Sequence, residues 1–243
     1  MKLPEYPRTL HLADSGGRES KHSCALDEIA GQHLVIEEKV DGSHCGLSFD
    51  EQAELRVFTR NTVLESPPVR HDFRLLDQLA REAIDELWEV LGDRYVLYGE
   101  WARVAHTVYY DALPSYFLED DIFDRVAGRF LSTPRRQALV AALPPAFSRS
   151  VVVLHGGSLS ELAELHALVG PSTYKSERWR ERCPDLAAVE DHDEMEGLYI
   201  KQEDPDFVLR RLKWIRPGFL AHIAASGNHW RARDELLNRL ADE

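Results

Sequence analysis

Apolar and polar residues alternate in short runs along much of the chain, which is typical of β-strands with two unlike faces. We predict strands near residues 33–39, 43–49, 54–59, 94–101, 115–123, 150–154, 197–201 and 207–214. Helical periodicity falls between these runs, most clearly over 72–91, where apolar residues recur every three or four positions. The pattern predicts a mixed α+β domain with mostly antiparallel strands.

Weaker helical patterns occur in the middle of the chain and near its end. We expect helices at 134–143, where Thr133 can cap and Pro134 occupies the first turn, and at 158–168, near 217–225 and at 229–240. The polar segments 12–24 and 171–195 are expected to be loops. We therefore expect a main domain over 1–216 and a short helical C-terminal extension, 217–243, packed on it.

Composition sets limits on the class of protein. The 243 residues are 44% hydrophobic, enough for one large core. No apolar run approaches the ~20 residues of a membrane span, and the N-terminus lacks a signal-peptide pattern, so we expect a cytoplasmic protein that does not contact membranes. Three cysteines without C-x-x-C spacing indicate neither a disulfide framework nor a zinc site.

The net charge of -13 argues against nucleic-acid binding through bulk electrostatics. Basic residues nevertheless cluster locally, at Arg178, Arg180 and Arg182 and again at Arg210, Arg211, Lys213 and Arg216. A solvated charged face explains the first cluster equally well. On a strand, Arg211 and Lys213 would share one face, with Leu212 on the other. Two cations on one face indicate a phosphate site.

Lys39 lies at the end of a predicted strand and opens the sequence Lys39-Val40-Asp41-Gly42. A lysine amine in such a place can act as a nucleophile. Gly42 permits a tight turn beside the amine, and Asp41 is expected to shape that turn. Taken alone, this tetrapeptide is more often an ordinary charged turn.

Four further segments follow in order and change that interpretation. They are Thr59–Asn61, Leu97–Trp101, Tyr116–Ile122, and Glu196–Lys201 followed closely by Leu209–Trp214. The ordered set resembles the covalent nucleotidyltransferases, and most of all the ATP-dependent RNA ligases similar to RNA ligase 2. The resemblance spans roughly residues 34 to 216 and implies the nucleotidyltransferase fold.

The resemblance implies that Lys39 attacks the α-phosphorus of ATP and releases pyrophosphate, leaving a lysyl-AMP phosphoramidate. Lys201, Arg211 and Lys213 are the cations expected to lower the pKa of its amine. Arg211 and Lys213 would also contact the α-phosphate. Related enzymes usually carry lysine at the position of Arg211, and arginine keeps the charge.

Other residues take nucleotide and metal roles by the same resemblance. Glu196 would hold Mg²⁺ or Mn²⁺. Glu100 would contact the ribose and Glu38 the adenine edge, while Phe117 would stack on the base. Arg60 would contact a phosphate, and Gly42 and Lys201 would complete the nucleotide site. Two positions depart from the family pattern. Asp120 replaces the second aromatic residue of F-x-x-F-D-I, and His44 stands where Arg, Lys or Asn is common. A ribose or phosphate contact and a plain exposed histidine are equally open for His44.

Only about thirty residues follow Lys213, too few for the OB barrel that DNA ligases and capping enzymes generally append. We therefore expect an ATP-dependent RNA ligase that joins 3′-OH and 5′-phosphate ends of nicked or duplex-held RNA, with or without a helper protein. A small ATP-dependent DNA ligase and a non-catalytic nucleotide-binding regulator are the alternatives. Segments 106–111, 154–175, 229–230 and 238–240 also resemble this family, with no physical role evident from their sequence.

Overall fold

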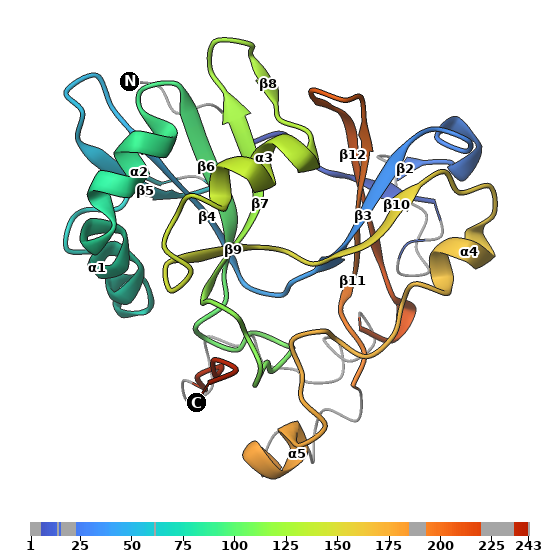
Figure 1. Cartoon of the computed structure of the whole chain (residues 1–243). Helices are drawn as coiled ribbons and strands as arrows, with labels where there is room; N and C mark the ends of the chain where they lie inside the picture. The colour runs from blue at the N-terminus through green and yellow to red at the C-terminus, as the bar shows by residue number, and fades with distance from the viewer. Residues whose placement is uncertain are drawn as a thin grey trace.

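The computed structural model describes residues 6–13, 15, 23–60, 62–184, 193–219 and 236–242. Two β-sheets form its two halves, with α1 (Arg74–Glu82) and α2 (Ile84–Leu91) on the outer side of one and α4 (Leu162–His166) on the outer side of the other (Figure 1). Helix α3 (Thr133–Val140) lies between the halves, and the short α5 (Trp179–Arg182) lies away from both. The fold is α+β with mostly antiparallel strands, as predicted.

The first sheet has the strand order β10-β3-β11-β12-β1-β2. Its strands are β1 (Leu10–Leu12), β2 (Ser23–Cys24), β3 (Leu34–Lys39), β10 (Val153–Gly157), β11 (Gly197–Glu203) and β12 (Val208–Ile215). Alternate residues such as Ile36, Ile200 and Leu212 pack in one hydrophobic core on the side of α4. The intervening residues, among them Glu37 and Lys39, therefore lie on the opposite, inner face.

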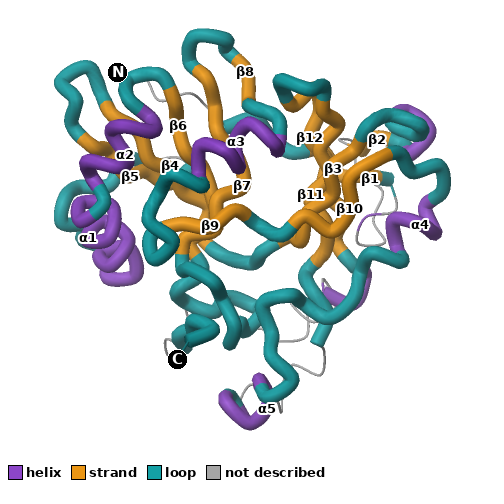
Figure 2. Tube along the Cα trace, viewed as in Figure 1, coloured by secondary structure: helices purple, strands orange, loops and turns teal. Residues whose placement is uncertain are grey.

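The second sheet has the order β5-β4-β6-β7-β8, with β9 paired parallel to β7. Its strands are β4 (Ser43–Phe49), β5 (Leu55–Thr59), β6 (Tyr95–Trp101), β7 (Phe117–Asp124), β8 (Arg129–Phe130) and β9 (Ser148–Ser150). Leu47 and Leu97 pack on its outer face against Leu76 and Leu87 of the two helices. Figure 2 shows the strands of both sheets converging on the middle of the molecule, where the two inner faces meet.

Several predicted elements differ in extent from those observed. The pattern over 72–91 forms a 3₁₀ turn (His71–Phe73) and two helices interrupted at Ala83, whose φ of -103° and ψ of 23° leave the α region. The single strand predicted near 150–154 is two strands, β9 and β10, that join different sheets. The loops predicted over 12–24 and 171–195 are wrong in part, because β2 and the end of β1 lie in the first and α5 lies in the second, while β8 and another 3₁₀ turn, η2 (Leu26–Glu28), had no sequence prediction.

The helix predicted at 229–240 is wrong over its last part. Leu237 and Leu240 form isolated β-bridges with Val104 and Leu113 instead. The Asn238 amide accepts from the backbone N–H of Tyr110 and donates to a second loop carbonyl, which holds this segment against the loop. These long-range contacts use the polar groups that a helix would pair locally. Residues 217–219 are helical, and 220–235 lie outside the described residues.

No helix in the described ranges is long and apolar enough to cross a membrane. The three cysteines are free and buried.

Candidate active site

Lys39 and Glu196 meet where β3 and β11 come together. Lys39 pairs with Gly197 across the sheet, so Glu196 stands immediately beside it. The Lys39 Nζ donates to Glu196 Oε2 over 2.6 Å, and the lysine side chain is 17% exposed. A Cβ on Gly197 would lie 2.1 Å from the Trp214 carbonyl oxygen of β12, so only glycine permits this approach. The expected nucleophile and the expected metal-binding carboxylate are thus in direct contact.

The environment of Lys39 does not lower its pKa, contrary to the sequence-based expectation. Burial alone would lower the pKa of the amine, but Glu196, Glu100 and Asp41 attract the charged form and raise it above the ordinary value. Burial also raises the pKa of Glu196 to about 7, against the opposing effect of Lys39. Carboxylates rather than cations dominate the surroundings of the amine.

The turn after Lys39 is fixed by a segment far away in sequence. Asp41 Oδ2 accepts from the backbone N–H groups of Thr107 (2.7 Å) and Val108 (3.0 Å). The Asp41 N–H donates to the Tyr110 hydroxyl over 2.8 Å. At Gly42, a Cβ would lie 2.9 Å from a backbone oxygen of β6. Asp41 shapes the turn, as expected, and the segment 106–111 has a role that sequence reasoning could not supply.

Three cations without an ion pair lie near Lys39, beyond the carboxylates that contact its amine. Among the described residues, Lys213, Arg60 and Arg8 make no ion pair. Lys213 lies on the inner face of β12, and burial followed by the charges of Lys39, Arg60 and Arg8 lowers its pKa. His11 of β1 is the direct strand neighbour of Lys213. Burial, then Lys213, Arg8 and Lys39, lowers the pKa of His11. Sequence analysis missed Arg8 and His11 because nothing local marks β1 or the residues before it.

Glu100 faces the inner side of β6 next to His44 of β4, its cross-strand partner. His44 Nδ1 lies 3.5 Å from Glu100 Oε1 and 4.0 Å from Asp120 Oδ2. Burial alone would lower the pKa of His44, but Glu100 and Asp120 outweigh it and raise it. The two departures from the family pattern, at positions 44 and 120, therefore adjoin each other and Glu100.

A narrow cavity runs between these groups and Lys39. Lys39, Glu100, Asp120 and Tyr199 are among its lining residues, and its volume is about 10 Å³. That volume accommodates roughly one water molecule.

The Glu38 carboxylate binds a loop on the far side of β3, and Glu38 also lines the cavity beside Lys39, so its expected contact with the adenine edge stays a prediction. It follows Ile36 in the alternation of β3 and so faces the outer side. Its carboxylate accepts from the Ser172 hydroxyl and from the Thr173 N–H (2.9 Å) and hydroxyl (2.6 Å). Glu38 therefore anchors the loop containing Ser172 and Thr173, part of the 154–175 segment that sequence left unassigned.

Phe117 is displaced from its expected role. Its side chain is fully buried on the outer face of β7, in the core beneath α1 and α2. Its ring stacks on Phe147 with 5.7 Å between centroids. A ring packed in this way cannot also lie against adenine, so the structure does not bring Phe117 to the cavity.

Lys201 and Arg211 belong to a set of buried ions that joins the inner faces of the two sheets. We call this set the buried charge network; its members are Glu37, Glu119, Asp121, Arg136, Lys201 and Arg211. Arg211 forms a two-point ion pair with Asp121, through Nε (2.8 Å) and Nη2 (2.9 Å), and Lys201 pairs with Glu37 over 2.9 Å. Lys201 is fully buried, so it does not reach a nucleotide in this arrangement. The expected α-phosphate contact of Arg211 is replaced by Asp121.

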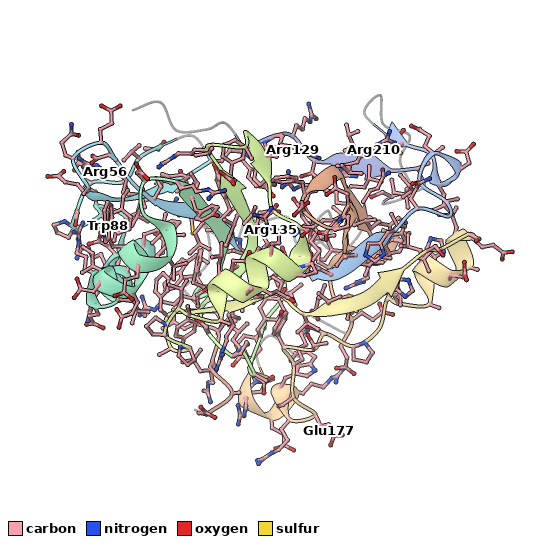
Figure 3. The ribbon with its side chains drawn as sticks, turned by 45° about the horizontal axis from the view of Figure 1, so that its top comes forward. Arg56, Trp88, Arg129, Arg135, Glu177 and Arg210 are labelled. Atoms are coloured by element: carbon pink, nitrogen blue, oxygen red, sulfur yellow. The ribbon has the colours of Figure 1, made fainter. Side chains whose placement is uncertain are left out.

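Each arginine of the first basic cluster, residues 178–182, is paired with a carboxylate. Arg178 pairs with Glu181, Arg180 with Asp193, and Arg182 with Asp111. Figure 3 shows Glu177, next to Arg178, at the end of the molecule remote from the sheets. The charged-face interpretation therefore accounts for this cluster.

Known proteins resemble this chain both in sequence and in fold. A family model described as RNA ligase matches residues 32–215. A Naegleria gruberi RNA ligase variant solved with ATP and Mn has 21% identity and a TM-score of 0.57, covering 82% of this chain and 53% of that one. A second variant of that ligase, solved in the apo state, has 20% identity and a TM-score of 0.59, covering 92% and 60%. At this identity the likeness shows the fold, and the chain spans just over half the length of these ligases. No curated protein matches in sequence.

Proposed function

The chain belongs to the RNA ligase family, and from this membership we propose that it is an ATP-dependent ligase that joins 3′-OH and 5′-phosphate ends of RNA. The contact between Lys39 and Glu196 at the junction of β3 and β11 carries the proposal. Residues 1–216 would form the adenylyltransferase domain and 217–243 an extension packed on it.

In the first step, the Lys39 amine attacks the α-phosphorus of ATP. The new N–P bond forms as the bond to the pyrophosphate oxygen breaks, which leaves lysyl-AMP. The amine must lose a proton before it attacks, and its raised pKa opposes that loss. In the second step the AMP passes to the RNA 5′-phosphate. The RNA 3′-OH then attacks the activated phosphate and releases AMP.

The donor set at Lys39 fits a hard divalent ion such as Mg²⁺ or Mn²⁺. Glu196 offers a carboxylate directly beside the Lys39 amine. Such an ion, when bound, supplies positive charge against the phosphates. We assign Glu196 to hold it. Its charge would oppose the pull of Glu196 on the Lys39 proton.

Lys213 and Arg60 would stabilise the charge that develops on the phosphates during transfer. The β1 segment extends this cationic side, because His11 stands beside Lys213. We place the pyrophosphate end of ATP along Lys213, Arg60, Arg8 and His11. Cations held in place before the reaction stabilise transition-state charge most effectively.

Incubation with α-labelled ATP and Mg²⁺ tests the chemistry. We expect a covalent AMP adduct that is labile to acid, as phosphoramidates are. A protein that binds labelled ATP but forms no adduct would instead be the nucleotide-binding regulator.

Single-turnover sealing by preadenylylated enzyme tests the substrate. Matched nicks should differ only in the sugars at the 3′-OH side, because a ribose there favours A-form geometry and offers a 2′-OH that a site can read. We expect much faster sealing with ribonucleotides at that side, whatever sugar carries the 5′-phosphate. Equal rates, or a preference for DNA, would favour the DNA ligase alternative.

A further inference from the structure

His44, Glu100 and Asp120 converge from three neighbouring strands of the second sheet. One ligand atom from each lies within 4.8 Å of the other two. His44 and Glu100 are direct partners across β4 and β6, which sets their side chains on the same face. Neither His44 nor Asp120 follows the pattern of the family that the sequence resembles, so their meeting is a property of this chain.

Asp120 reaches this cluster through a β-bulge. Tyr98 pairs with Asp121 and Gly99 with Glu119, which leaves Asp120 as the extra residue of β7. Bulges redirect a side chain out of the regular alternation and are common beside functional sites. Here the bulge turns the Asp120 carboxylate toward His44.

The three side chains retain buried atoms that still need partners. Asp120 has a side chain only 8% exposed, and its Oδ1 is buried without a hydrogen-bond partner in the described part of the chain. The same holds for Glu100 Oε2 and His44 Nε2. Unsatisfied buried polar atoms are costly, and a bound cation would satisfy the two carboxylates.

We propose that His44, Glu100 and Asp120 form a binding site for a divalent transition-metal ion such as Zn²⁺. Metal bonds of about 2.0–2.2 Å place ligand atoms roughly 3–3.5 Å apart. The His44 Nδ1 atom is 3.5 Å from Glu100 and 4.0 Å from Asp120, so small side-chain rotations complete the set. Water would fill the remaining positions.

The choice of ion follows from the donors. Mg²⁺ favours oxygen ligands and retains its waters, whereas imidazole suits zinc and its neighbours. This site differs from the one assigned to Glu196, which has only oxygen donors. The two would be loaded by different ions.

Metal titration of the full chain without ATP tests this site whether or not the protein ligates RNA. The metal-stripped protein should bind one Zn²⁺ by calorimetry, and Co²⁺ should give visible absorption bands that report protein coordination. His44→Gln and Asp120→Asn should each weaken Zn²⁺ binding by at least ~10-fold, whereas excess Mg²⁺ should not displace it. Circular dichroism establishes that each variant is folded.

His106→Gln and Glu196→Gln are the matched controls. His106 lies 3.9 Å from one carboxylate, that of Asp41, and so resembles His44 without completing a three-residue set. Both controls should bind Zn²⁺ within ~2-fold of the parent. The proposal is overturned if the parent binds no Zn²⁺, if both folded site variants bind it normally, or if only Glu196→Gln loses it.

Discussion

Two groups of charged residues lie on the inner faces of the sheets, and they differ in how their charges are paired. The buried charge network matches three carboxylates with three cations, and Arg136, Lys201 and Glu37 in it are fully buried. Around Lys39, by contrast, Lys213, Arg60 and Arg8 make no ion pair within the described ranges. Paired and buried ions hold the two sheets together, whereas cations without an ion pair are available to a ligand. Membership of a motif does not separate the two groups, since Lys201 and Lys213 both come from motif segments.

Substitution of Lys39 and of Lys201 should separate the two groups most strongly. Lys39→Met removes the nucleophile, so no AMP adduct should form while the protein stays folded. Labelled ATP followed by gel electrophoresis measures this. Lys201→Met is the comparison, and the fraction that remains folded should still form the adduct. An adduct in Lys39→Met would show that another residue is the nucleophile.

Arg136→Met tests the structural half of the comparison. It leaves Glu119 buried without its arginine and Glu37 with Lys201 alone, and breaking a buried pair in this way costs about 3–5 kcal/mol of unfolding free energy. Urea denaturation measures the loss. Arg135→Met is the control on the same helix, because Arg135 is partly exposed and its ion pair, with Asp206 over 3.4 Å, lies at the surface. Similar losses for both variants would contradict the assigned role of the network.

Lys213→Ala tests the unpaired half. Loss of a cation aimed at the transferring phosphate should slow adenylylation by ~10²-fold with little change in stability. Glu196→Ala should have an effect of similar size. Arg210→Ala is the control, since Arg210 lies on the opposite face of β12 and pairs with Glu28. Near-normal rates from folded Lys213→Ala and Glu196→Ala would remove both residues from the site.

His11→Ala should have a smaller effect that is confined to ATP binding. A hydrogen bond to a charged group contributes about 1.5–3 kcal/mol, so the KM for ATP should rise roughly 10-fold or more. Transfer of AMP from preadenylylated enzyme to RNA should not change, because pyrophosphate has already left. His33→Ala, an exposed histidine, is the control. An equal slowing of both steps would argue for a structural role of His11.

Phe117→Leu should have the smallest effect on catalysis. The substitution changes a core side chain on the outer face of β7, so we expect a loss of about 1 kcal/mol in stability and a KM for ATP within ~2-fold of the parent. Thermal melts and adenylylation kinetics measure the two quantities. A large rise in KM with unchanged stability would restore the base-stacking role.

The sequence by itself determined the longer strands and most helices, because their period of alternation is a local property. It also determined the order of the motif segments, and with it the family. Alternation further predicted that Arg211 and Lys213 share a face, and the structure places both on the inner side of β12.

Only the tertiary structure decided which residues of the motif segments lie near Lys39 and which are paired or packed elsewhere. Arg211 forms an ion pair with Asp121 of the other sheet, the Glu38 carboxylate accepts a hydrogen bond from Ser172, and Phe117 packs in the outer core. Each outcome depends on a partner that is distant in the chain or on which side of a strand is covered, and local pattern carries neither. The bulge that brings Asp120 to His44 is of the same kind, because one extra residue in a ladder appears only when the partner strand is in place.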